Sequence, residues 1–233
     1  MSDVDGKQLK NSNSAPGTTG RVLHSPALYD VLAWLFLRGR EGPFREKLID
    51  LARLTAGETV LDVACGTGTL AIAAKRRVGP AGSSHGIDAS PKMIARATRK
   101  ARTRGVEVVF RNAIVEALPY PDAHFDAVLS TLMLHHLPRK ARQQCAREMR
   151  RVLKPGGRVL AVDFGEPHGH RGGLLSHLHR HGHVALRDIV EVLSDAGLCV
   201  VESGAVGIKD LQFVLATVPA SQATDASVNG LHR

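Results

Sequence analysis

One stretch of the sequence, residues 60–74, limits the possible fold more than any other. It is an apolar, β-branched run that ends near Asp62, followed by the glycine-rich segment Gly66-Thr67-Gly68 and a second apolar run from Leu70. This order predicts a buried strand, a tight turn and a helix. Glycines let the backbone approach a ligand closely, and free amides at the helix start can donate hydrogen bonds to it. The pattern is typical of a turn that binds a nucleotide cofactor.

Two classes of nucleotide cofactor are compatible with these glycines. The spacing Gly-x-Gly-x-x-Ala matches the dinucleotide fingerprint, and Asp88 follows about 20 residues later, where that fold places an acid. Asp62 separates the two classes, because a carboxylate at the end of the first strand would repel the anionic pyrophosphate of a dinucleotide. A cofactor with a cationic end is therefore favoured, and a nicotinamide-dinucleotide-dependent oxidoreductase is the alternative.

Around Asp62 and Gly66-Thr67-Gly68 the sequence resembles the class I S-adenosylmethionine-dependent methyltransferases, whose first motif is a strand ending in Asp or Glu followed by Gly-x-Gly. The small-molecule branch of that family has acid-Ala, Leu-Pro-Phe-Pro and Phe-Asp motifs, and their counterparts here are Asn112-Ala113, Leu118-Pro119-Tyr120-Pro121 and Phe125-Asp126. Within this branch the chain resembles the ubiquinone and menaquinone biosynthesis methyltransferases. The resemblance implies in-line transfer of a methyl group from S-adenosyl-L-methionine to an oxygen, sulfur, nitrogen or carbon atom of a small molecule. The product would be S-adenosyl-L-homocysteine.

The resemblance also implies the architecture. We expect an α/β fold with a doubly wound, seven-stranded, mostly parallel sheet of the Rossmann-like methyltransferase type, and an N-terminal helical cap. The third strand is expected over residues 106–110, and the last two strands, 198–206 and 211–218, are expected to form an antiparallel edge. Gly42-Pro43 is expected to break the cap, whose second helix would run over 44–54.

The composition of the two ends predicts the domain limits. Residues 1–20 and 219–233 are rich in Ser, Asn, Gly and Thr, which is typical of mobile segments. We therefore expect flexible tails at both ends and one methyltransferase domain over 21–218, in which 21–55 form the cap.

The family resemblance implies cofactor contacts at the ends of the first four strands. Asp88 would accept both ribose hydroxyls, because a carboxylate offers two acceptor oxygens; a helix-capping role is its alternative. Asn112 replaces the usual acid and would accept from the adenine amine through its amide oxygen, and Met93 would cover the adenine or lie in the core. The complete expected set is Asp62, Ala64, Gly66, Thr67, Gly68, Asp88, Ala89, Met93, Asn112, Ala113 and Thr131.

Three side chains are candidates for the catalytic role. His135 and His136 follow the fourth strand, whose carboxyl end lies at the topological switch point where open parallel sheets bind ligands. A neutral imidazole there can accept a proton from the acceptor, and packing or capping is the alternative role for the pair. Tyr29, in the cap, is expected to reach the methyl-transfer cleft.

A histidine-rich segment, residues 168–183, has no counterpart in the cofactor motifs. Only His177 and His181 have the i, i+4 spacing of a helical chelating pair, and no carboxylate or cysteine accompanies them. We name no metal ligand in this segment, and a lid over the acceptor pocket, a metal site and an inert connection are the three interpretations that remain.

Charge and cysteine content bear on partners and location. The 31 Lys and Arg outnumber the 22 Asp and Glu, for a net charge of +9, which suits an anionic substrate, a nucleic acid or an acidic membrane surface. The Pro-Pro-aromatic motif of base-methylating relatives is absent, so we expect no specific nucleic acid. Three cysteines without Cys-x-x-Cys spacing and no run long enough for a transmembrane segment predict a cytoplasmic protein. A homodimer is compatible with the sequence, as is a cofactor-binding module without catalysis.

Overall fold

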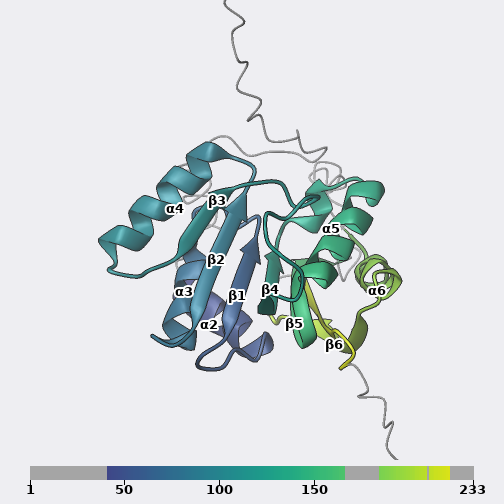
Figure 1. Cartoon of the computed structure of the whole chain (residues 1–233). Helices are drawn as coiled ribbons and strands as arrows, with labels where there is room; N and C mark the ends of the chain where they lie inside the picture. The colour runs from purple at the N-terminus through teal and green to yellow at the C-terminus, as the bar shows by residue number, and fades with distance from the viewer. Residues whose placement is uncertain (1–40, 166–183, 209, 221–233) are drawn as a thin grey trace, which may run out of the picture.

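The computed structural model describes residues 41–165, 184–208 and 210–220. In this part of the chain a seven-stranded sheet is covered by helices on both faces (Figure 1). The strands are β1 (Thr59–Val63), β2 (Ser83–Asp88), β3 (Val109–Asn112), β4 (Phe125–Thr131), β5 (Leu153–Phe164), β6 (Cys199–Ala205) and β7 (Leu211–Thr217). The helices are α2 (Glu41–Leu51), α3 (Thr69–Val78), α4 (Pro91–Thr103), the short 3-10 helix η1 (Leu134–His136), α5 (Arg139–Val152) and α6 (Leu186–Asp195).

The sheet has the order β3-β2-β1-β4-β5-β7-β6. Strands β3, β2, β1, β4 and β5 pair in parallel, and β7 pairs antiparallel with both β5 and β6. The predicted doubly wound sheet with an antiparallel edge is therefore confirmed. The strand order reverses between β1 and β4, so their carboxyl ends form the switch point at which such sheets bind ligands.

Two apolar cores flank the sheet. Leu61 and Val128 pack with α5 and α6 in one core, whereas Val60 and Leu129 pack with α2 and α3 in the other. Neighbouring strand residues point to opposite faces, so both must be apolar when both faces are covered. This explains why the central strands read as continuous apolar runs, and why an acid at the end of one of them is unusual.

Two predicted element limits were wrong. Helix α2 already includes Gly42-Pro43 in its first turn, where a proline costs nothing because the amide it lacks would have no intrahelical partner. The third strand covers Val109–Asn112 and not 106–110. The Val106 amide donates to the Ala101 carbonyl at the end of α4, 3.1 Å away, so Val106 belongs to the helix terminus.

Several predictions concern residues outside the described part of the chain. The N-terminal tail, the first part of the cap with Tyr29, the histidine-rich segment 168–183 and residues 221–233 all lie there. Of the helices that the structure describes, none combines the length and the apolar character needed to cross a membrane.

Candidate functional site

The glycine-rich turn has the backbone that the sequence predicts. Ala64, Gly66 and Gly68 all have positive φ, at 55°, 54° and 74°. A Cβ on Gly68 would lie 2.6 Å from the ring of Phe110 and 2.8 Å from the side chain of Ala97, so only glycine fits this position. The turn leads directly into α3, and Ala64 holds a conformation that non-glycine residues adopt rarely and mainly at functional sites.

Asp62 is the penultimate residue of β1 and lies inside the protein. Asp62 is only 3% exposed, and this burial raises the pKa of its carboxyl group to about 7. The nearby Arg45 and a hydrogen bond from the Ala71 amide lower the pKa but do not outweigh the burial. Within the part of the chain that the structure describes, the Oδ2 atom has no hydrogen-bond partner. A buried carboxylate with an unused oxygen is costly unless something cationic approaches it, so this site suits the cationic end of a ligand.

Asp88 is held beside the same turn by two backbone amides. Gly66 donates to Oδ2 at 2.9 Å and Ser90 donates to Oδ1 at 2.8 Å. Each carboxylate oxygen has a further lone pair, so both could also accept a hydroxyl. Capping the helix was the alternative role for Asp88. The N-cap of α4 is Ser90, so Asp88 does not have that role.

The expected adenine contacts lie at the end of β3. Asn112 donates from its side-chain nitrogen to the Asp88 carbonyl at 2.8 Å, which leaves its amide oxygen available as an acceptor. The Ala113 amide, expected to donate to the adenine ring, donates to the same carbonyl at 3.2 Å. Ala89 is half-buried. Met93 is 2% exposed, as its core alternative predicts.

The end of β4 adds further unused polar atoms. Ser130 Oγ and Thr131 Oγ1 are buried and have no hydrogen-bond partner among the described residues. Ser130 pairs in register with Val63, next to Asp62. Leu132 has a positive φ of 55° directly after β4, like Ala64 after β1. The carboxyl ends of the two switch-point strands thus combine unusual backbone with unsatisfied polar groups, a combination that indicates a ligand site.

His135 has a partner that sequence reasoning missed. Its Nδ1 lies 2.6 Å from Oδ1 of Asp163, and its main-chain amide donates to Oδ2 at 3.0 Å. The Asp163 side chain is fully buried and that of His135 is 8% exposed. His136 packs beside it, with ring centroids 3.8 Å apart. The available signal for Asp163 was an acid at the end of an otherwise apolar strand, the same signal that identified Asp62.

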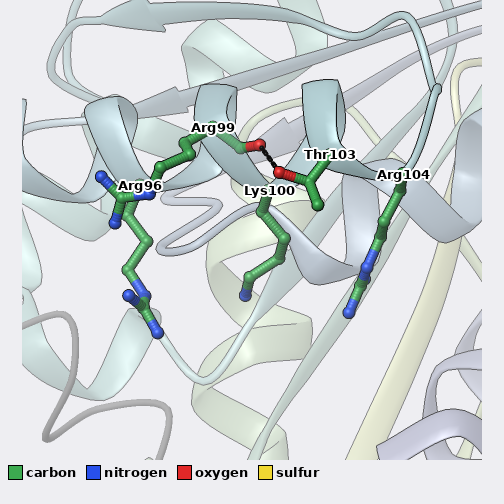
Figure 2. Close-up of a pocket in the computed structure, with 5 residues that line it drawn as sticks. All are labelled: Arg96, Arg99, Lys100, Thr103 and Arg104. Atoms are coloured by element: carbon green, nitrogen blue, oxygen red, sulfur yellow. Dashed lines mark hydrogen bonds between the residues drawn. The ribbon is translucent and has the colours of Figure 1, made fainter.

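Basic side chains of α4 and of its C-cap, Arg104, line a hollow of about 320 Å³ (Figure 2). Lys100 belongs to it and also reaches the cofactor turn, where it donates to Thr67 Oγ1 at 2.6 Å and to Thr69 Oγ1 at 2.9 Å. The hydroxyl of Thr67, expected among the cofactor contacts, is therefore engaged by α4. The lining residues are Arg96, Arg99, Lys100, Thr103 and Arg104.

Tyr29 and the histidine-rich segment lie outside the described residues, so their expected roles stay predictions. Within the ranges that the structure describes, no three His, Cys, Asp or Glu side chains come together in a way that could hold a metal ion.

Comparison with known proteins gives a consistent result. Residues 60–157 match the family described as methyltransferase domain. Over 139 residues the chain is 40% identical to a demethylmenaquinone methyltransferase of Thermus thermophilus, a match covering 60% of this chain and 62% of the relative. It is 38% identical over 149 residues to the ubiquinone/menaquinone biosynthesis C-methyltransferase UbiE of Pseudomonas putida, covering 63% and 57%. The match thus spans about six-tenths of the length of these curated relatives.

Solved structures agree on the fold. A SAM-dependent methyltransferase from Aquifex aeolicus superposes with a TM-score of 0.67 at 24% identity, over 84% of this chain and 100% of that one. The [4+2]-cyclase SpnF reaches the same TM-score at 20% identity, over 88% and 100%. At such identities the likeness shows the fold alone, because one fold supports different reactions. Residues 60–157 thus match the family described as methyltransferase domain, and the fold is the one that these solved structures share.

Proposed function

We propose that this protein transfers the methyl group of S-adenosylmethionine to a carbon atom of a small hydroquinone-like ring. The observation that carries the cofactor half of the proposal is the pair of acids, Asp62 and Asp88, at the ends of two neighbouring strands around one glycine-rich turn. The acceptor half is supported by the names of the relatives, which refer to demethylmenaquinone and to ubiquinone and menaquinone biosynthesis.

The hydrogen-bond acceptors around the turn fit S-adenosylmethionine. Asp62, whose Oδ2 has no partner among the described residues, would face the ammonium group of the methionine end, and Asp88 would accept the two ribose hydroxyls. Asn112 would accept from the adenine amine through Oδ1, because its nitrogen is already used. The same Asp62 carboxylate would repel a dinucleotide pyrophosphate, which disfavours the oxidoreductase alternative.

The protein's task in such a reaction is mainly one of alignment. When bound, S-adenosylmethionine supplies a methyl group already activated by the sulfonium. The side chains at the ends of β1 and β4 need to hold the acceptor carbon in line with it, and such positioning is a large source of rate in bimolecular reactions. A basic group at this edge would assist, because a ring carbon becomes strongly nucleophilic when the neighbouring hydroxyl loses its proton.

A direct test uses methyl-labelled S-adenosylmethionine and a panel of reduced acceptors. The panel would contain short-chain demethylmenaquinol and demethylubiquinol analogues, a catechol, an aromatic amine and a thiol. We expect label on a ring carbon of a hydroquinone and an equal amount of S-adenosylhomocysteine.

Two variants calibrate this assay. Asp88→Ala should bind and turn over less, whereas Asp122→Asn, at a carboxylate that is 77% exposed, should match the parent. Label on oxygen or nitrogen alone would refute C-methylation. Cofactor binding without transfer to any acceptor would favour the alternative of a binding module without catalysis.

A further inference from the structure

A buried acid at the end of β5 is not used by the cofactor site described above. Asp163 is fully buried, and both of its oxygens accept hydrogen bonds: Oδ1 from the Phe164 amide at 2.8 Å and Oδ2 from the His135 amide at 3.0 Å. A carboxylate withdrawn completely from water needs such partners, since its burial is otherwise strongly unfavourable. Among the described residues, its side-chain partner is His135.

The geometry determines which nitrogen of His135 carries the proton. Both oxygens of Asp163 already accept from backbone amides, so the carboxylate acts as the acceptor and Nδ1, 2.6 Å from Oδ1, acts as the donor. In a neutral imidazole with a proton on Nδ1, the lone pair is on Nε2. The side chain is held twice, through its ring and through its own main chain, which fixes where Nε2 lies.

The neighbourhood of the ring is compact. In the part of the chain that the structure describes, the titratable groups in contact with the His135 ring are Asp163 from β5 and His136 from η1, and the ring of Phe164 packs edge-on at 5.4 Å. His135 follows β4 by a few residues, so it lies at the same edge of the sheet as Asp62, beside the switch point.

We propose that Asp163 is a positioning residue that makes His135 the base for the acceptor hydroxyl, an inference that rests on the methyl transfer to a hydroquinone proposed above. The O–H proton moves to Nε2 of His135, and the adjacent ring carbon forms a bond to the methyl carbon. The sulfur–methyl bond breaks and its electron pair stays on sulfur, which gives S-adenosylhomocysteine. The ring carbon then loses its hydrogen to water as a proton, and His135 returns its proton to the oxygen, so one proton is released in total.

The variant Asp163→Asn tests this arrangement with almost no change in volume. Asparagine has one acceptor oxygen where aspartate has two, so it can no longer accept from both the Phe164 amide and the His135 amide. With its nitrogen towards Nδ1 it moves the ring proton to Nε2, as happens when a triad aspartate is replaced by asparagine. With its nitrogen towards the His135 amide it removes the main-chain contact that holds the ring in place. We expect kcat to fall by about 100-fold or more, the usual contribution of a general base, with unchanged affinity for S-adenosylhomocysteine. His135→Gln should show the same loss, and Asp122→Asn is the matched control for an Asp→Asn change.

Two readouts separate this role from a merely structural one. Side-chain ¹⁵N NMR should show the Nδ1-protonated tautomer of His135 in the parent. The loss in kcat should also shrink for an acceptor whose hydroxyl is acidic enough to be ionised at the assay pH. If Asp163→Asn does not fold, His135→Gln and the parent's NMR tautomer still decide the question.

The possible results separate the proposed methyl transfer from the role inferred for Asp163. A parent that transfers no methyl group to any hydroquinone contradicts the proposed function, and with it this inference. A parent that is active while both variants keep its kcat and its pH profile contradicts the inference alone. An Nε2-protonated His135 in the parent, or variants that lose cofactor affinity in proportion to rate, would likewise overturn it.

Discussion

Replacing Asp62 by asparagine should make the ligand-free protein more stable while weakening its affinity for S-adenosylmethionine. The carboxyl group has a pKa of about 7 in the folded protein, mainly because it is buried, against 3.8 for an ordinary aspartate. Between about pH 4 and pH 7 the folded state keeps a proton that the unfolded state has lost. Stability therefore falls as the pH rises through this window and stays low above it.

The size of the effect follows from the two pKa values. Their difference corresponds to at most about 4 kcal/mol at pH 8. Asparagine can still accept from the Ala71 amide, but its nitrogen takes the place of the unpartnered Oδ2 and also lacks a partner, so we expect a net gain of roughly 1–3 kcal/mol. In a domain of this size that is on the order of 2–10 °C in Tm.

Thermal unfolding of the parent and of Asp62→Asn from pH 4 to pH 9, each with and without S-adenosylmethionine, measures both effects. The Tm difference between the ligand-free proteins should grow up to about pH 7 and then level off. The cofactor should raise the Tm of the parent more than that of the variant. A variant that is less stable at every pH, or one that the cofactor stabilises as much as the parent, would refute the reasoning.

Three further changes have defined outcomes. Asp88→Ala should weaken S-adenosylmethionine binding by about 1.5–3 kcal/mol in calorimetry, and unchanged affinity in a folded variant would remove Asp88 from the ribose site. Gly68→Ala should lower the Tm more than Gly57→Ala, because both have positive φ but only Gly68 would meet Phe110 and Ala97; equal losses would mean that the close packing is unimportant. Burial and the nearby His124 and Arg111 lower the pKa of His85 to about 4, so stability should fall as the pH drops from about 6.5 towards 4. His85→Phe should lose roughly 1–2 kcal/mol less unfolding free energy than the parent over this pH range, a figure reduced for the partial exposure of the ring. An acid transition that is the same in parent and variant would contradict this role of His85.

Features encoded in adjacent residues could be predicted from the sequence. The strand, the turn and the helix around Gly66 depend on a local order of apolar residues and glycines, and the acids at the ends of β1 and β2 follow directly from that order. The sheet as a whole could be predicted because the repeated strands and helices resemble a known family. In each case neighbouring residues carry the information.

Contacts between distant residues could not be predicted in this way. His135 was a candidate, but its partner Asp163 lies 28 residues away and meets it only because β4 and β5 pair in parallel. Lys100 reaches Thr67 across 33 residues in the same manner. The limits of β3 also depend on pairing, since its register with β2 places Asn112 opposite Asp88. These features follow from tertiary packing, which leaves no periodic signal along the chain.

Calorimetric titration of the purified protein measures whether the carboxyl ends of β1 and β2 bind S-adenosylmethionine. The titrants are S-adenosylmethionine, S-adenosylhomocysteine and the reduced and oxidised forms of both nicotinamide dinucleotides, with Asp88→Ala and Asp122→Asn run beside the parent. We expect both adenosyl sulfur compounds to bind the parent with one-to-one stoichiometry. They should bind Asp88→Ala more weakly than the parent and Asp122→Asn as tightly as the parent. The dinucleotides should not compete with them for the site. Binding of NAD(H) or NADP(H) in preference to both adenosyl compounds would contradict the account.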